Sequence, residues 1–197
     1  MHNRKCRLYI ENMLSQKCKK IVSGVLKSLG FECNVYTLGE ADVKGIVTCA
    51  QRQDIKILLS KYGLKLLDVE KTQLIDTIIN LIDEKMCEED HESKSNFSDY
   101  LEDKVAYEYS YLANLFSRIK GTTLNNYIIA HKIEKVKELL LYDHCSLTEI
   151  SYKLDYSSVA HLSNQFKKVT GITPSMFKDL SSMRHQPEIA RMVAMAS

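Results

Sequence analysis

The sequence predicts a two-part fold: an α+β N-terminal domain with the ferredoxin-like order βαββαβ, followed by an all-α domain with two helix-turn-helix units. Two observations carry this prediction. Strand-like alternation and helix-like periodicity follow one another up to about residue 70. Further along, the segment 157–177 repeats the spacing of apolar, glycine and threonine positions found 50 residues earlier. A repeat at one fixed offset indicates a duplicated structural unit.

The first 70 residues predict four strands and two helices. In chain order these are a strand at 6–11, a helix at 15–29, strands at 34–38 and 42–48, a helix at 54–62 and a strand at 64–68. Three glycines mark the breaks: Gly30 closes the first helix, Gly39 separates the strand pair and Gly63 stops the second helix. This order of elements is that of the ferredoxin-like split unit.

A third helix and a polar linker are expected after this domain. The segment 70–86 carries a wide apolar stripe at helical spacing, formed by Leu74, Ile75, Ile78, Ile79, Ile82 and Met86. The stripe either packs on its own domain or pairs with a second chain, as in a coiled coil. The acidic, unpatterned stretch 87–95 is expected to be a linker, with His91 solvated. The predicted domains are therefore 1–69 and 96–180, joined by 70–95 and followed by a tail at 181–197.

The downstream copy of the repeat shows each part of a helix-turn-helix unit. Ser146 and Glu149 have the spacing of a capping box, so a first helix is expected to begin near Leu147. A turn follows at 155–156, where aspartate tolerates a left-handed backbone. The second helix is expected to start at a cap on Ser157 or Ser158, to bury Leu162, Phe166 and Val169, and to end at Gly171. Thr173 and Pro174 then begin another helix.

The upstream copy aligns with this pattern when Phe116 is placed on Phe166. The matched pairs are Leu112 with Leu162, Asn114 with Asn164, Ile119 with Val169, Gly121 with Gly171, Thr123 with Thr173 and Tyr127 with Phe177. Before the turn the offset is 49, which pairs Leu101, Val105 and Tyr107 with Ile150, Leu154 and Tyr156. A helix over about 124–142 joins the two copies. The buried positions of both second helices are expected to be Leu112, Leu115, Phe116, Leu162 and Phe166.

These residues resemble the AraC/XylS family of bacterial transcription regulators. The resemblance covers about 96–180 and rests on YLANLFSRIKG (111–121), Tyr127, the helix around 133–140 and SLTEISYKLDYSSVAHLSNQFKKVTGITPSMFK (146–178). Two residues depart from the family pattern: Asp155 stands where the family usually has glycine, and Glu108 where it usually has serine. The resemblance implies a DNA-binding domain of two helix-turn-helix units joined by a long helix, with the N-terminal domain as a sensor, dimeriser or protein contact.

The resemblance also implies which residues meet DNA. The second helix of each unit would enter the major groove, where asparagine can bond adenine, serine and histidine can donate or accept, and small apolar side chains can meet a thymine methyl. The expected DNA-binding residues are Ser110, Tyr111, Asn114, Arg118, Ser158, Val159, Ala160, His161, Ser163, Asn164, Lys167 and Lys168. The expected partner is double-stranded DNA, with RNA polymerase and a second copy bound through 70–86 as further candidates.

Charge and composition limit the other possibilities. The formal net charge is +2, and ten Lys and Arg balance ten Asp and Glu between Ser95 and Leu180, which argues against strong non-specific DNA affinity. With 45% hydrophobic residues and no uncharged apolar run near membrane length, the protein is expected to be cytoplasmic. The six cysteines show no disulfide or CxxC spacing, so free thiols are expected. No catalytic constellation recurs at recognisable spacing, so the protein is expected not to be an enzyme.

The N-terminal segment is similar to heavy-metal-associated domains, which carry a metal loop with two cysteines. Met13 and Cys18 remain in that loop, but Ser15 occupies the place of the first cysteine. A soft ion such as Cu(I) prefers two thiolates, so no metal site and no cofactor are expected. The alternative to a DNA-binding regulator is a metal-handling or redox-sensing protein whose helical domain has lost DNA binding, with Cys18 as a reactive thiol.

Overall fold

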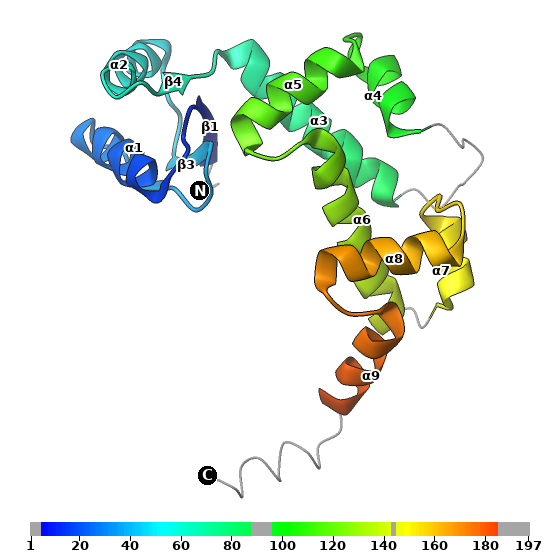
Figure 1. Ribbon diagram of the computed structural model, residues 1–197. Coiled ribbons are helices and arrows are strands. Elements are labelled where there is room, and N and C mark those ends of the chain that lie inside the picture. The colour runs from blue at the N-terminus through cyan, green and yellow to red at the C-terminus, as the bar shows by residue number, and fades with distance from the viewer. Residues whose placement is uncertain (1–4, 88–95, 143–144, 185–197) are drawn as a thin grey trace, which may run out of the picture. The chain divides into compact units, whose positions relative to one another are not determined.

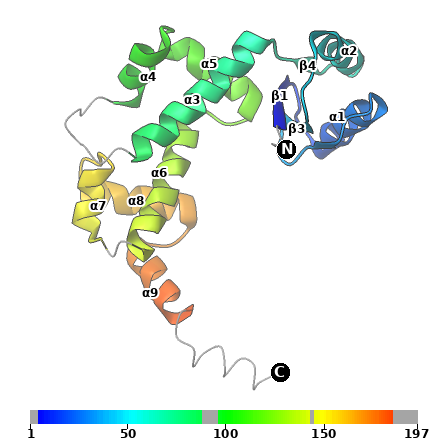
Figure 2. The same ribbon diagram turned by 180° about the vertical axis from the view of Figure 1, so that it is seen from behind.

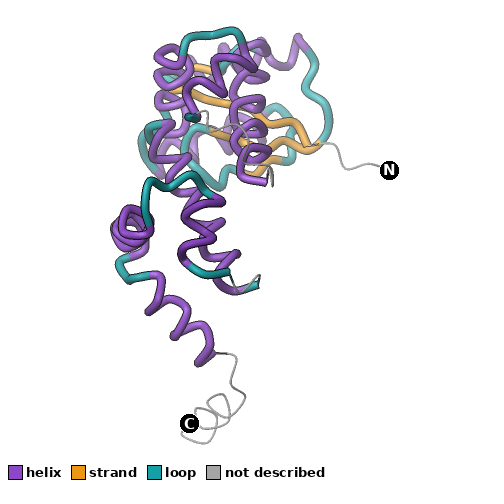
Figure 3. Tube along the Cα trace, turned by 90° about the vertical axis from the view of Figure 1, so that its right-hand side faces the viewer, coloured by secondary structure: helices purple, strands orange, loops and turns teal. Residues whose placement is uncertain are grey.

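A computed structural model describes residues 5–87, 96–142 and 145–184 of the chain. Most of the predicted acidic linker (87–95) and most of the predicted tail (181–197) lie outside these residues. Strands occur in the N-terminal part, and helices make up the other described elements (Figure 1; Figure 3). Residue contacts divide the chain into two compact units, one formed by 1–81 with 96–127 and the other by 82–95 with 128–197. No helix among the described residues is long and apolar enough to cross a membrane.

The first unit begins with a four-stranded antiparallel sheet. The elements are β1 (Lys5–Glu11), α1 (Gln16–Ser28), β2 (Cys33–Asn34), β3 (Glu40–Lys44), α2 (Cys49–Ser60) and β4 (Lys65–Leu66). The strand order across the sheet is β2-β3-β1-β4, so β1 and β3 lie in the middle. Their register places Leu8 opposite Ala41 and Tyr9 opposite Glu40. Because side chains alternate along a strand, these two pairs lie on opposite faces of the sheet.

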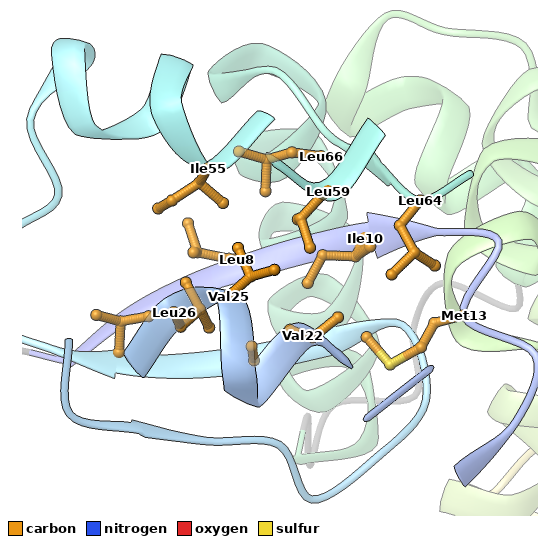
Figure 4. Packing of buried hydrophobic residues seen from close by; sticks show 12 residues of the cluster. Leu8, Ile10, Met13, Val22, Val25, Leu26, Ile55, Leu59, Leu64 and Leu66 are labelled. Atoms are coloured by element: carbon orange, nitrogen blue, oxygen red, sulfur yellow. The ribbon is translucent and has the colours of Figure 1, made fainter. Parts of the chain in front are cut away.

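One face of the sheet packs against α1 and α2. Leu8 and Ile10 of β1 point toward Val22 and Leu26 of α1 and Ile55 and Leu59 of α2 (Figure 4). All six side chains have at most 1% of their surface exposed. Burial contributes about 1.5–3 kcal/mol for each large aliphatic side chain, so this cluster stabilises the α+β part substantially.

The sequence located these elements well but misplaced some ends. The helix α2 begins at Cys49 rather than at 54, because Thr48 and Gln51 form a capping box that the periodicity alone did not reveal. The strand expected at 34–38 is reduced to Cys33–Asn34, and the chain then turns to Gly39, which has φ +85°. The second strand of the pair starts directly after this glycine.

The helices α3 (Val69–Cys87), α4 (Phe97–Val105), α5 (Tyr109–Lys120) and α6 (Leu124–Leu141) follow. The apolar stripe of α3 is covered within the chain, since Ile75, Ile78 and Ile82 are all fully buried. A second chain could reach these side chains only if they first lost their packing. Their burial favours packing within one chain over the coiled-coil alternative.

The second unit has its own core beneath α7 (Leu147–Lys153), α8 (Val159–Thr170) and α9 (Pro174–Arg184). Leu162 and Phe166 of α8 pack with Ile133 and Val136 of α6 and with Ile150 of α7, and all five are fully buried. The sequence-based prediction for Val169 is wrong, because this side chain is 47% exposed. It lies in the last turn of α8, three residues after the buried Phe166. Figure 2 shows α7, α8 and α9 from behind.

Candidate nucleic-acid interface

The two helix-turn-helix copies have the same backbone features at matched positions. In the turns, Ala106 and Asp155 both adopt the left-handed conformation, with φ of 54° and 52°. The helices α5 and α8 end at Gly121 and Gly171, which have φ of 68° and 83°. Both copies thus contain a helix, a left-handed turn residue, a second helix of 12 residues and a glycine C-cap. The duplication inferred from the sequence is confirmed at the level of backbone conformation.

Matched side-chain contacts support the same conclusion. Phe116 packs edge-on against Tyr127 with ring centroids 4.9 Å apart, and Phe166 packs in the same way against Phe177 at 5.6 Å. The hydroxyl oxygens of Thr123 and Thr173 each accept a hydrogen bond from a backbone N–H three residues on, at 3.1 and 3.3 Å. In each copy, this aromatic pair and this cap connect the second helix to the helix that follows it.

The outer face of α8 carries most of the residues predicted to meet DNA. His161, Asn164 and Lys168 are exposed and recur at three and four residues, so they share one side of the helix. Ala160 and Lys167 are also exposed, whereas Val159 and Ser163 are half-buried. The opposite side is the buried one, with Leu162 and Phe166. The helix therefore has an apolar side for its own core and a polar side for a partner.

The start of α8 holds His161 in a defined orientation. The Ser158 hydroxyl accepts the backbone N–H of His161 at 3.1 Å and so caps the helix. The hydroxyl of Ser157 lies 3.0 Å from Nδ1 of His161, and the ring of Tyr156 meets the imidazole edge-on at 5.4 Å. These contacts leave Nε2 as the ring nitrogen available to an outside partner.

Ser157 thus has a second role that was not predicted from the sequence, where it is only an alternative cap. The available signal was the spacing of four residues between this serine and His161, which places two side chains on one side of a helix start. The turn itself is fixed by Lys132 of α6, whose Nζ donates to the backbone carbonyl of Leu154 at 2.7 Å and lies 5.3 Å from the ring centre of Tyr156. Burial raises the pKa of Tyr156 to about 12, and its hydroxyl donates to Gln165 at 2.7 Å.

The outer face of α5 is similar in layout but different in chemistry. Ser110, Tyr111, Asn114 and Arg118 are exposed, and the ring of Tyr111 stacks on Tyr107 at 5.3 Å. Glu108 has the backbone conformation of an N-cap but makes no capping hydrogen bond. The Glu102 carboxylate instead accepts the N–H of Tyr109 at 2.6 Å. A more distant acidic residue thus replaces the serine cap that the resemblance leads one to expect.

The cations at the ends of the two helices differ in their surroundings. Arg118 and Lys168 occupy matched positions, 50 residues apart. Nη2 of Arg118 lies 3.8 Å from the Glu11 carboxylate of β1, and Nζ of Lys120 lies 2.7 Å from that of Glu40 of β3. Among the described residues, no ion pair within 4 Å engages Lys167 or Lys168. Lys167 and Lys168 at the end of α8 are therefore exposed, whereas Arg118 and Lys120 at the end of α5 each lie within 4 Å of a carboxylate of the sheet.

The residues of the metal-type loop do not fit a soft metal ion. Met13 is 4% exposed and packs in the core of the α+β part, as its position in Figure 4 shows. The hydroxyl of Ser15 lies 3.4 Å from the sulfur of Cys18, and this contact lowers the pKa of the thiol. One thiol and one hydroxyl are a poor donor set for Cu(I) or Zn(II). No group of three potential metal-ligating side chains occurs in the described parts of the chain, and all six cysteines are free.

The helical part of the chain is similar to known proteins. Residues 101–179 match the model of a helix-turn-helix domain. An uncharacterized HTH-type transcriptional regulator from Pseudoalteromonas carrageenovora is 36% identical over 86 residues, which cover 42% of this chain and 51% of that protein. The xylose operon regulatory protein of Escherichia coli K12 is 33% identical over 92 residues, which cover 47% of this chain and 24% of that protein. The chain thus spans about half of the first relative and a quarter of the second.

Among solved structures, the C-terminal domain of the two-component response regulator yesN from Fusobacterium nucleatum has 27% sequence identity and a TM-score of 0.46. That match covers 52% of this chain and 95% of that domain. Together, the family match and the relatives identify the region 101–179 as a helix-turn-helix domain, similar to regions of transcription regulators.

Proposed function

We propose that this protein is a sequence-specific DNA-binding transcription regulator in which α5 and α8 each read bases in the major groove. The observation that carries the proposal is the matched pair of helix-turn-helix units, each with a buried side and an exposed polar side. A helix of this kind fits the major groove, where its N-terminal half reaches base edges. The similarity of 101–179 to transcription regulators supports the same function.

The second reader helix, α8, is the better equipped of the two. Asn164 can form a bidentate contact with adenine, and Nε2 of His161 can hydrogen-bond one further base. Ala160 and Val159 offer methyl groups to thymine, while Ser158 and Ser163 add hydroxyls. Lys167 and Lys168, one turn further along, are placed to contact phosphates, which fix the register of the helix without reading sequence.

The first reader helix, α5, offers Asn114 in the position matched to Asn164. Ser110 and Tyr111 lie one turn before it, and the stacking of Tyr111 on Tyr107 limits the directions in which its hydroxyl can point. The joining helix α6 has 18 residues, a length of about 27 Å at ~1.5 Å per residue. That length is near the ~34 Å between successive major-groove faces, so one chain could read two adjacent groove segments.

For the N-terminal part we propose a ferredoxin-like domain that acts as a sensor or interaction module. The order βαββαβ and the antiparallel strand order β2-β3-β1-β4 support this fold. The donor set at Met13, Ser15 and Cys18 does not favour the metal-handling alternative. RNA polymerase and a second copy of the chain remain candidate partners, although the burial of the α3 stripe makes 70–86 a poor surface for dimerisation.

Selection of bound sequences from a random duplex library tests this function. The expected result is an enriched motif with two conserved blocks centred about one helical turn, or ~10 base pairs, apart. Binding without any enriched sequence would contradict base reading by these helices. A single conserved block would show that only one of the two helices reads bases.

A further inference from the structure

The face of the N-terminal sheet that points away from α1 and α2 carries polar side chains, yet it is largely buried from solvent. Arg7, Tyr9 and Glu11 alternate with the core residues of β1 and therefore lie on this face. Tyr9 has no exposed surface and Glu11 only 7%. The hydroxyl of Tyr9 donates to the Asp76 carboxylate of α3 at 2.6 Å, which accounts for part of this cover.

The end of α5 supplies more of the cover. It lies beside β1 in both Figure 1 and Figure 2, within the first compact unit. Nζ of Lys120 lies 2.7 Å from the Glu40 carboxylate and 5.3 Å from the ring centre of Tyr9, and its side chain is only 12% exposed. Nη2 of Arg118 lies 3.8 Å from the Glu11 carboxylate. Both basic side chains in the last turn of the first reader helix thus face acidic residues of the sheet.

The approach of the two backbones explains the glycine at 39. A methyl group added at Gly39 would lie 1.7 Å from the carbonyl oxygen of Ile119, much closer than atoms can approach. This glycine also has φ +85°, a conformation that side chains disfavour. The turn between β2 and β3 is therefore shaped to receive the end of α5.

The matched positions at the end of α8 are not covered by a sheet within the described ranges. Lys168 matches Arg118 in the repeat but has no carboxylate partner among the described residues. Val169 matches Ile119, yet it is 47% exposed while Ile119 is 2% exposed. The sheet contact distinguishes the first reader from the second.

We infer that the polar sheet face, formed by Tyr9, Glu11 and Glu40, is a docking surface for the end of α5, and that DNA phosphates compete with it for Arg118 and Lys120. This inference rests on the proposed DNA binding. A cation held by a carboxylate cannot release counterions from a phosphate at the same time, and the acidic face adds repulsion where DNA approaches. Docking therefore weakens the first reader, and undocking strengthens it. Any ligand or partner that favours the undocked state would raise DNA affinity.

Two variants test the competition. Glu40→Gln removes the 2.7 Å ion pair with Lys120, and Gly39→Ala places a methyl group against Ile119. Each is expected to bind duplex DNA more tightly, by about fivefold per restored phosphate contact at ~0.15 M salt, because one such contact adds about 0.9 to the slope of log K against log salt. The gain should be the same for random and selected duplexes, since phosphate contacts carry no base information. Fluorescence anisotropy of the full chain over a salt series measures both quantities.

Each variant has a matched control. Glu32→Gln makes the same charge change at a carboxylate that pairs with Lys44 of β3, 2.9 Å away, rather than with α5. Gly45→Ala introduces a methyl group at another left-handed glycine, φ +95°, with no atom within 4 Å of it. Both controls should keep wild-type affinity and salt dependence. Thermal unfolding of all four variants checks that they are folded.

Unchanged or weaker binding by folded Glu40→Gln and Gly39→Ala would overturn the docking inference while leaving the proposed function intact. A wild-type chain that binds no duplex at low salt would overturn both. A second measurement needs no variant: DNA should increase hydrogen exchange of backbone amides in β1, β3 and the last turn of α5 if it displaces the sheet face. Greater protection of these amides in the complex would contradict competition.

Discussion

At the scale of single residues, the start of α8 orients His161, a side chain that we propose reads a base. Ser157 and Tyr156 hold the imidazole of His161 by contacts of 3.0 and 5.4 Å, so the protein alone orients the ring. A group fixed in this way loses less conformational entropy on binding than a free one. The two adjacent serines have separate tasks, because Ser158 caps the helix and Ser157 orients the ring.

We therefore expect Ser157→Ala and Ser158→Ala to differ. Ser158→Ala should lower the free energy of unfolding by about 1 kcal/mol through the lost cap. Ser157→Ala should leave stability nearly unchanged but relax base preference at the position that His161 reads. Thermal unfolding and binding-site selection on both variants measure the two effects. Equal loss of stability with unchanged base preference would show that Ser157 does not position the ring.

Glu40 gives a pH dependence whose sign follows from its surroundings. Burial alone would raise the pKa of this carboxyl, but hydrogen bonds from Lys120 and Thr37 outweigh it, and the pKa lies below its ordinary value of 4.5. A lowered pKa in the folded state stabilises the protein above the ordinary value, and this stability is lost as the pH falls through the folded pKa.

The difference in unfolding free energy between the wild type and Glu40→Gln should therefore be constant from neutral pH down to about 4.5 and shrink below it. Chemical denaturation of both proteins over a pH series measures this difference. A difference that persists unchanged into strong acid would show that the Glu40 carboxylate does not stabilise the fold through Lys120.

At the scale of secondary-structure elements, the two turns contain a backbone conformation that their residues do not favour. Ala106 and Asp155 have φ of 54° and 52°, and neither is glycine. An L-residue other than glycine pays roughly 1 kcal/mol in this region, somewhat less for aspartate, which can bond locally. The packing of the helices on each side of the turn imposes the left-handed conformation despite this cost.

Ala106→Gly should therefore raise the free energy of unfolding by up to about 0.5–1 kcal/mol, the relief of strain exceeding the extra entropy of the unfolded chain. The matched control is Ala130→Gly, the same change at an exposed position inside α6, which should lower stability by about 1 kcal/mol. Chemical denaturation of both variants provides the comparison. Destabilisation by Ala106→Gly would show that the turn is not strained.

The elements also show what the sequence could predict. Capping boxes, glycine C-caps and apolar periodicity predicted α1, α3, α6, α7 and α8 to within about two residues, because these signals are local. The start of α2 was predicted too far along the chain, although Thr48 and Gln51 have the spacing of a capping box. The exposure of Val169 was not predictable, because apolar spacing along a helix does not show which of its last residues the core covers.

At the scale of the whole molecule, the docking of α5 on the sheet was outside the reach of sequence reasoning. Glu40 and Lys120 are 80 positions apart, and no periodicity or motif links them. From the sequence, Arg118 was predicted to be a DNA-binding residue, like Lys167 and Lys168. The structure shows that the basic residues at the ends of the two reader helices are not equivalent.

The small net charge of +2 makes each free cation important. Lys167→Ala should weaken binding to all duplexes by a similar factor and reduce the slope of log K against log salt by about 0.9. Lys153→Ala, which removes an exposed lysine at the end of α7, is the matched control for the change in net charge. A loss confined to one preferred sequence would contradict a phosphate role for Lys167.

Parallel binding-site selection on Asn114→Ala, Asn164→Ala and the control Asn125→Ala tests whether the two matched helices read bases. Asn125 is exposed in the first turn of α6, outside both readers. Each reader variant should lose preference at its own base position, at a cost of ~1–3 kcal/mol, and the two positions should lie about one helical turn apart. The control should retain the wild-type motif. Reader variants that also retain the wild-type preference at every position would contradict base reading by α5 and α8.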